Sequence, residues 1–266
     1  MIIDKYNKRA KEINSLLCVG LDPDFEKLPE KFKTLPHPQF EFNKYIIGET
    51  HEFAAAYKPN MGSYEVRGAK GWEDLEMTMD YLRKNYPDIF TICDAKRADI
   101  GYTNELYAKA IFDTLGFDAV TLHPYLGQEA LKPFLDRKDK VSIILCRTSN
   151  PGAGELQDLI TTPEARPLWW VVAEKVSKEW NKNSNCMLVV GATYPAELGE
   201  VRKIVGDLTI LVPGIGTQGG SVKEVMEAGL SSEKLGLIVS SSKAIIFSEN
   251  LKEEARKLCE EIRSNL

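Results

Sequence analysis

Eight short apolar runs, most of them separated by segments with helical periodicity, constrain the fold of this chain more than any other feature. The runs cover residues 16–21, 54–60, 89–93, 119–122, 141–146, 186–191, 209–212 and 235–239. Apolar runs of this length that alternate with helices are typical of a parallel sheet covered by those helices. Eight such units match a closed (β/α)8 barrel. We therefore expect an α/β protein with a single TIM-barrel domain over residues 1–266.

Helical spacing of apolar residues predicts the segments between these runs. The predicted helices cover residues 4–13, 39–53, 72–86, 103–115, 128–135, 163–180, 195–205, 221–228 and 249–262. The first of them precedes the first strand and adds an extra N-terminal helix to the barrel. Residues 28–38 contain three prolines and are expected to be irregular. Residues 151–157 contain two glycines and are expected to form a mobile loop.

Charge and composition exclude several classes of function. A net charge of -5 and a pI near 5.5 offer no attraction to nucleic acid or to an anionic membrane. No apolar run is long enough to span a membrane and the charged N-terminus lacks a signal-peptide core, so a cytoplasmic protein is expected. The five cysteines include no Cys-x-x-Cys pair, which favours buried free thiols. The three histidines lack the spacing of a zinc site, and no metal site is expected.

The third apolar run ends abruptly in charged residues. Asp94, Lys96 and Asp99 follow it within six positions. If the strand continues to Lys96, the side chains of Asp94 and Lys96 point to the same side, because side chains alternate along a strand. On this segment alone, a structural ion pair at a strand end and a functional site are equally good interpretations.

The ends of the other strands favour a functional site. In barrels of this kind the active site lies at the carboxyl ends of the strands. The polar residues at those ends are Asp22, Lys58, Asn60, Asp94, Lys96, Asp99, His123, Thr148, Ser149, Gln218 and Lys243. A structural ion pair does not require several strands to deliver charge to one mouth, whereas a binding cleft does.

The loops after the last two strands indicate a phosphate-bearing ligand. Residues 214–220 contain four glycines just before a predicted helix, where free backbone amides favour an anion. Residues 240–243, with the sequence Ser-Ser-Ser-Lys, add hydroxyl groups and a cation. The loops after strands seven and eight commonly hold a phosphate in (β/α)8 barrels.

Several motifs together resemble those of one enzyme family. Residues 94–101, Asp-Ala-Lys-Arg-Ala-Asp-Ile-Gly, resemble the Asp-x-Lys-x-x-Asp signature of orotidine 5'-phosphate decarboxylase. The similarity extends over nearly the whole chain, in the order and spacing of the longer-chain branch of that family, through residues 20–23, 57–60, 148–151, 190–192 and 213–220. Related sugar-phosphate decarboxylases and synthases share the signature, but its combination with residues 58–60 and 213–220 is highly specific.

The resemblance implies a cofactor-independent carboxy-lyase that converts orotidine 5'-monophosphate to UMP, the last step of de novo pyrimidine nucleotide synthesis. It needs neither a metal nor an organic cofactor. Lys96 would protonate ring carbon 6 as carbon dioxide leaves, within a charge network of Lys58, Asp94, Lys96 and Asp99. The resemblance also implies a homodimer with shared active sites.

The same resemblance assigns the substrate contacts. Asp22, Lys58 and Asp99 would hold the ribose hydroxyls, Thr148 and Ser149 the pyrimidine, and Gln218 and Lys243 the phosphate. The remaining expected substrate-binding residues are Asn60, Pro213, Gly219 and Ser242. Asp99, Ile100 and Thr103 would reach across the dimer interface into the neighbouring site.

Lys243 departs from the pattern, because the family usually has arginine at this position. Lysine supplies the charge but not the two parallel hydrogen bonds of a guanidinium group. We therefore expect Lys243 to bind the phosphate as the family's arginine would, but more weakly.

The chemistry supports the assignment independently of the resemblance. Loss of carbon dioxide from an sp² carbon without an electron sink leaves a localised carbanion, so catalysis has to come from fixed charge and a nearby proton donor. A lysine between two carboxylates is held in its protonated form, which suits a donor. Binding energy from the distant phosphate would close the loop at 151–157 over the site.

Three other functions fit parts of the same pattern. A Schiff-base aldolase that uses Lys58 or Lys96 as nucleophile requires a lowered lysine pKa, which flanking carboxylates oppose. A catalytically silent phosphosugar- or nucleotide-binding barrel would bind UMP without turnover. A metal-dependent sugar-phosphate decarboxylase with the same signature would lose its activity in EDTA.

Overall fold

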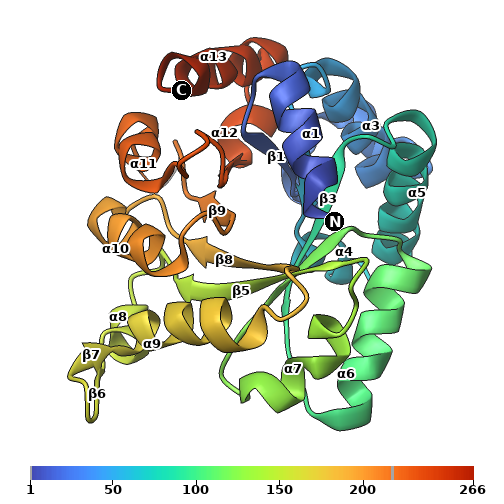
Figure 1. Cartoon of the computed structure of the whole chain (residues 1–266). Helices are drawn as coiled ribbons and strands as arrows, with labels where there is room; N and C mark the ends of the chain where they lie inside the picture. Colours follow the sequence, from blue (N-terminus) through green and yellow to red (C-terminus); the bar gives the residue numbers. More distant parts are fainter. Residues whose placement is uncertain (1, 217–218) are drawn as a thin grey trace.

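Eight parallel strands form the closed barrel that the sequence predicts (Figure 1). The computed structural model describes residues 2–216 and 219–266. Around the barrel the order is β1-β10-β9-β8-β5-β4-β3-β2. The strands are β1 Leu17–Leu21, β2 Ala56–Pro59, β3 Phe90–Arg97, β4 Ala119–Leu122, β5 Val141–Arg147, β8 Cys186–Val190, β9 Ile210–Pro213 and β10 Leu237–Ser241. Seven of the eight predicted runs contain all or most of one strand, and the run 89–93 contains the first half of β3.

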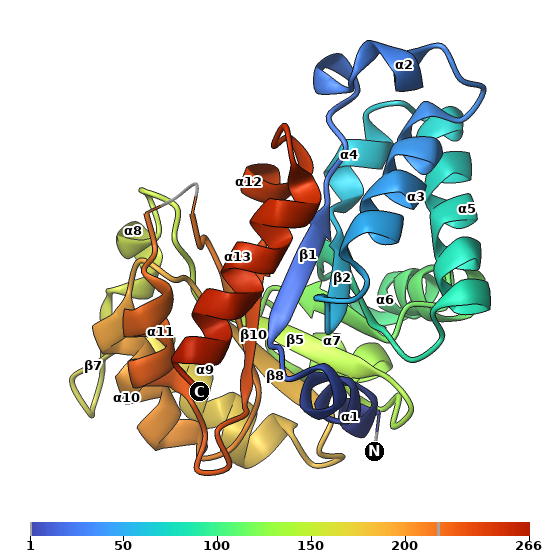
Figure 2. The same cartoon turned by 90° about the horizontal axis from the view of Figure 1, so that it is seen from above.

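Helices cover the outside of the barrel, as Figure 2 shows from above. The nine predicted helices correspond to α1 Ile3–Ile13, α3 Pro38–Thr50, α5 Ala69–Asn85, α6 Gly101–Ala108, α7 Gly127–Leu135, α9 Leu168–Lys175, α10 Pro195–Val205, α11 Val222–Gly229 and α13 Leu251–Ser264. Wider π-helical turns, Lys109–Thr114 and Val176–Trp180, continue α6 and α9. The extra helix α1 lies at the amino end of the barrel, where the Tyr6 hydroxyl donates to the Leu237 carbonyl at 2.6 Å.

Three predicted segments differ from the structure. Residues 28–38 are not wholly irregular, since the short helix α2, Glu30–Lys33, lies within them. The expected loop at 151–157 ends in helix α8, Gly154–Gln157. The helix predicted from residue 163 begins only at Leu168, because a hairpin of β6, Ile160–Thr161, and β7, Arg166–Pro167, precedes it. Pro167 keeps Arg166 extended and has no amide hydrogen to donate, which favours strand over helix at this point.

Two short helices at the mouth of the barrel lie outside the predicted set. They are α4, Met61–Glu65, directly after β2, and α12, Lys243–Ile246, after β10. All five cysteines are buried and free, as predicted. Across the described residues, none of the helices combines the length and the apolarity needed to cross a membrane.

Candidate active site

The carboxyl ends of the strands bring several predicted site residues around one cavity. This cavity, of about 340 Å³, is lined by Asp22, Lys58, Pro213–Ile215 and residues 240–243. Asp22 follows β1, Lys58 lies in β2, and the other two groups come from the ends of β9 and β10. Residues that lie far apart in the sequence therefore meet at the mouth, as predicted for a binding cleft.

Asp94 is the centre of the charged cluster beside this cavity. Its Oδ2 lies 2.8 Å from Lys58 Nζ, and its Oδ1 lies 2.5 Å from Lys96 Nζ. The hydroxyl of Thr121 on β4 donates to Oδ1 at 3.0 Å, and Asn60 Nδ2 lies 3.4 Å from Oδ2. Asp94 and Lys58 are both buried, whereas Lys96 is exposed. One carboxylate thus holds a buried and an exposed ammonium group.

These contacts fix the charge states of the buried pair. Burial alone would raise the pKa of Asp94, but Lys58 and Lys96 outweigh that effect and hold the pKa well below its usual range. Burial alone would lower the pKa of Lys58, but the carboxylates of Asp94 and Asp22 raise it well above its usual range. Around neutral pH, Asp94 is therefore a carboxylate and Lys58 an ammonium ion.

An irregularity in β3 sets the direction of Lys96. The strand continues to Arg97 as the prediction required, but its pairing with β4 shifts register between Cys93 and Arg97. Lys96 itself has a positive φ of 47°, a backbone conformation that residues other than glycine rarely adopt. Its backbone amide donates to Thr121 Oγ1 at 3.0 Å, so the same hydroxyl group supports both Asp94 and Lys96. Such strain is typical of functional sites.

Asp99 lies apart from the Lys58–Asp94–Lys96 cluster. Among the described residues it takes part in none of the ion pairs, and its Oδ1 accepts from the Ile100 amide at 2.7 Å. The buried Asn104 side chain binds both the amide and the carbonyl of Asp99, which fixes the start of α6. Ile100 and Thr103 are exposed. The structure thus joins three of the four predicted network residues and leaves the fourth at the rim.

Asn60 connects the first two strand ends. Its backbone amide donates to Asp22 Oδ1 at 3.1 Å, and its side-chain oxygen accepts from the Gly62 amide at the start of α4. Asn60 also pairs with Asp94 through an isolated β-bridge. Asp22, Asn60 and Asp94 are therefore fixed relative to one another by direct contacts.

Thr148 and Ser149 lie at the end of β5, outside the lining of the 340 Å³ cavity that the described residues form. The Thr148 amide donates to Gln157 Oε1 at 2.9 Å, and its hydroxyl accepts from Gln157 Nε2 at 2.8 Å. Ser149 packs against Gly191, where an added Cβ would lie 2.7 Å from the Ser149 Cβ. Gln157 on α8 therefore holds the predicted pyrimidine-binding segment against the segment that was expected to be mobile.

The two predicted phosphate loops lie beside each other. In the first, Gly214 and Gly219 have positive φ values of 103° and 82°. Gln218 lies outside the described residues. Helix α12 begins in the second loop, with Ser242 at its N-cap and the exposed Lys243 in its first turn. The buried Ser242 hydroxyl has no hydrogen-bond partner among the described residues.

Gly20 allows the second loop to approach β1. A Cβ at this position would lie 2.4 Å from the Ser242 Cβ and 2.6 Å from its Oγ. Only glycine therefore fits between Asp22 and the N-cap of α12 without displacing them.

Several residues that support the site were missed by the sequence analysis. Thr121 is a single hydroxyl residue in an apolar run, and Gln157 is one polar residue among several in a loop. Arg97 pairs with Glu65 on α4 and so ties the end of β3 to the helix after β2. Of these residues, only Thr121 could have been found from the sequence, because the alternation of side chains along β4 turns it inward.

The described residues contain no group of three or more His, Cys, Asp or Glu side chains that could hold a metal ion. The clustered polar groups are instead two ammonium groups, carboxylates and hydroxyls. Such a set can bind a hydroxylated anionic ligand and present a protonated amine to it.

Comparisons with known proteins agree on one family. A family model described as "Orotidine 5'-phosphate decarboxylase / HUMPS family" matches residues 15–258. A relative from Flavobacterium johnsoniae named orotidine 5'-phosphate decarboxylase is 46% identical, and the match covers 98% of this chain and 97% of that protein.

Two solved structures from Leishmania donovani are similar as well. The OMP decarboxylase superposes with a TM-score of 0.88 at 39% identity, covering 99% of this chain and 98% of the other. The UMP synthase has a TM-score of 0.90 and 41% identity, covering 98% of this chain and 56% of that one.

Proposed function

Because the chain belongs to the orotidine 5'-phosphate decarboxylase / HUMPS family, we propose that it decarboxylates orotidine 5'-monophosphate to UMP. It is a carboxy-lyase of pyrimidine nucleotide synthesis that uses no cofactor. The observation that carries this proposal is the buried Asp94 carboxylate, which holds Lys58 and Lys96 beside a cavity with polar loops at its edge. The five cysteines of the protein are buried free thiols, which suits the reducing environment of the cytoplasm.

In this reaction Lys96 is the proton donor. The carbon–carboxyl bond breaks, carbon dioxide leaves, and the electron pair remains on ring carbon 6, where a proton from the Lys96 ammonium group neutralises it. Lys96 is exposed at the mouth and its Nζ is held at Asp94, so it is placed toward an entering ligand. Because the ionised Asp94 and the cationic Lys58 are fixed in advance, their reorganisation costs little during the reaction.

The nucleotide extends across the mouth from the charged cluster to the glycine loop. Asp22 and Lys58 line the cavity where the ribose hydroxyls bind, and Asn60 holds Asp22 in place. Amides around Pro213 and Gly219, the Ser242 hydroxyl, Gln218 and Lys243 bind the phosphate. Thr148 and Ser149 bind the pyrimidine, in a segment that Gln157 orders.

A second copy of this chain completes the site. Five exposed apolar residues at the start of α6, on α6 and just before α7 are here called the α6–α7 patch: Ile100, Tyr102, Leu106, Tyr125 and Leu126. Ile100, Tyr102 and Leu126 line one surface pocket. An apolar cluster of this kind on the surface is typical of an interface. Asp99 immediately precedes it and belongs to no ion pair among the described residues of its own subunit. We infer a homodimer in which Asp99, Ile100 and Thr103 reach the partner's site.

The Schiff-base alternative is disfavoured by the electrostatics at Lys58. A nucleophilic lysine needs a lowered pKa, whereas Asp94 and Asp22 raise the pKa of Lys58. Borohydride in the presence of a carbonyl substrate would trap an aldolase, and we expect no trapped adduct.

The proposal is tested by incubating the protein with orotidine 5'-monophosphate and EDTA and following the ultraviolet absorbance. We expect loss of the substrate absorbance and formation of UMP at the same rate with and without EDTA. A protein that binds UMP but leaves orotidine 5'-monophosphate unchanged would be the silent barrel instead. Activity that disappears in EDTA would indicate the metal-dependent alternative.

A further inference from the structure

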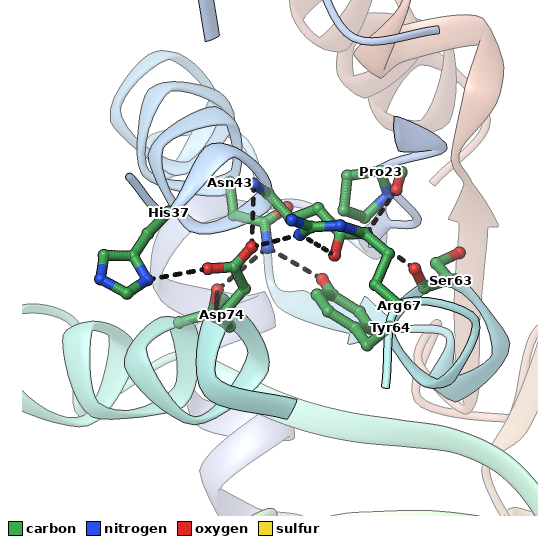
Figure 3. A network of polar contacts seen from close by, with 9 residues as sticks. Pro23, His37, Asn43, Ser63, Tyr64, Arg67 and Asp74 are labelled. Atoms are coloured by element: carbon green, nitrogen blue, oxygen red, sulfur yellow. Dashed lines mark hydrogen bonds and ion pairs between the residues drawn. The ribbon is translucent and has the colours of Figure 1, made fainter. Parts of the chain in front are cut away.

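A buried polar network contacts Pro23, in the segment after β1, and Ser63, in helix α4 (Figure 3). Its side chains come from the first turns of α3, from α4, from α5 and from the turn that joins α4 to α5. The members are His37, Gln39, Asn43, Tyr64, Arg67, Asp74 and Thr78. None of them is among the site residues predicted from the sequence.

Asp74 is the buried acceptor at the base of the network. Its side chain is only 1% exposed, and Arg67 Nη1 donates to its Oδ2 at 2.7 Å. The Gln39 amide donates to the same oxygen at 3.2 Å, and His37 Nδ1 lies 3.2 Å from Oδ1. A buried carboxylate is costly unless it is paired, so Arg67 cannot be removed without consequence for Asp74.

Gln39 connects Asp74 and Arg67 to the segment after β1 and to helix α4. Its Nε2 donates to the Pro23 carbonyl at 2.8 Å and to the Ser63 carbonyl at 2.7 Å, and its Oε1 accepts from Arg67 Nη1 at 2.9 Å. A guanidinium group can only donate, so Arg67 determines which end of the Gln39 amide faces it. The nitrogen is thereby directed at both carbonyls, one in the segment after β1 and one in helix α4.

Tyr64 holds the same loop from the other side of Asp22. Its hydroxyl donates to the Leu21 carbonyl at 2.9 Å and accepts from Asn43 Nδ2 at 2.8 Å. Leu21 and Pro23 are the two neighbours of Asp22 in the sequence. The network therefore binds the carbonyl groups on both sides of Asp22.

Arg67 also lies close to the mouth of the barrel. Its guanidinium carbon is 4.6 Å from the centre of the Phe25 ring, in the loop after β1. Together with Asp22, Asn60 and Lys243 it lines a second cavity of about 560 Å³ at the mouth. The path from Arg67 to Asp22 is thus short and consists of direct contacts.

We propose that Arg67, acting through Gln39 and Asp74, is a positioning residue that fixes Asp22 for binding the ribose of the nucleotide. The proposal rests on the proposed function and extends it to a residue that need not touch the substrate. A buried network that served folding alone would not have to hold both neighbours of Asp22.

A double-mutant cycle with Arg67→Met and Asp22→Asn tests the proposal, with kcat, KM and UMP affinity as readouts. We expect Arg67→Met to raise KM for orotidine 5'-monophosphate and to weaken UMP binding by about tenfold, while kcat changes less than about threefold. In the Asp22→Asn background, Arg67→Met should change KM and UMP affinity by less than about twofold. Equal effects of Arg67→Met in both backgrounds would overturn the proposal.

Two further variants keep the test decisive. If Arg67→Met does not fold, Gln39→Met takes its place in the cycle, because it removes the amide that joins Arg67 to the Pro23 carbonyl and keeps the Arg67–Asp74 ion pair. Asp118→Asn is the matched control, since Asp118 is a buried carboxylate at the amino end of the barrel that binds Lys5 at 2.7 Å. We expect it to lower Tm and leave KM unchanged. A parent protein without decarboxylase activity would refute the proposed function but not the role of Arg67. The role of Arg67 would then be tested by UMP affinity alone.

Discussion

Lys96 Nζ lies 2.5 Å from Asp94 Oδ1, on a strand whose backbone has a positive φ at Lys96 itself. The other oxygen of the same carboxylate binds Lys58. Asp94 is thereby tied to a buried cation, and Lys96 is the partner that remains exposed to an entering ligand. This difference in burial is consistent with the proposed roles, in which Lys58 holds the charge and Lys96 donates the proton.

Replacing Asp94 by asparagine is expected to destabilise the fold by about 3 kcal/mol, because the buried Lys58 loses its main partner. Urea unfolding at pH 7 measures this change. A variant as stable as the parent would mean that the Lys58–Asp94 pair contributes nothing to folding.

The stability that Asp94 contributes depends on pH in a defined direction. The pKa of Asp94 in the folded protein lies below the pKa of about 3.9 that the group has in the unfolded chain. The contribution is therefore fully present above about pH 5 and is lost as the pH falls toward the folded pKa. The free energy of unfolding of the parent should fall more steeply between pH 5 and pH 3 than that of Asp94→Asn. Parallel curves for the two proteins would contradict the ion pair.

Changing Lys243 to arginine should strengthen the phosphate contact. A guanidinium group can bind two phosphate oxygens at once, so KM for orotidine 5'-monophosphate is expected to fall by about three- to tenfold at unchanged kcat. Steady-state kinetics measures both parameters. If KM does not fall, Lys243 is not a phosphate ligand that arginine improves.

The close approach of β1 and α12 makes Gly20 intolerant of a side chain. Gly20→Ala should cost about 1–3 kcal/mol and raise KM, because its methyl group would displace Ser242. Gly48→Ala is a matched control in helix α3, where no atom other than those of the chain neighbours and the helix's own backbone lies within 4 Å of the added carbon. It should stabilise the protein by about 0.5–1 kcal/mol and leave KM unchanged. Equal stability of the two variants would refute the packing argument.

A charge in the α6–α7 patch should separate the proposed dimer. Leu106→Glu is expected to shift sedimentation from dimer to monomer and to reduce kcat/KM, because Asp99 then no longer reaches the partner's site. Leu35→Glu is the control, since Leu35 is an exposed apolar residue outside the patch. A parent that sediments as a monomer at all concentrations would contradict the shared site.

The parts of the fold that depend on local patterns could be predicted, whereas the parts that depend on distant contacts could not. The apolar runs located the eight strands, and the charges at the end of the third run marked the segment in which Asp94 and Lys96 form an ion pair. The start of α9 was placed too early because apolar spacing does not report the extended backbone before Pro167.

The support of the site illustrates the same limit. Arg67 and Asp74 look like ordinary surface charges in the sequence, and only the packing of α3, α4 and α5 buries Asp74 against Gln39. Gln157 likewise gains its role from the fold of α8 beside the end of β5. Neither spacing nor residue type indicates such contacts.

The measurement that tests the central claim most directly compares the parent with Lys96→Ala in the ultraviolet assay on orotidine 5'-monophosphate without added cofactor. Removal of the proton donor should lower kcat by at least about a hundredfold, while UMP binding by calorimetry remains measurable. Decay of the substrate absorbance at the parent rate in Lys96→Ala would contradict the assignment of Lys96 as the proton donor.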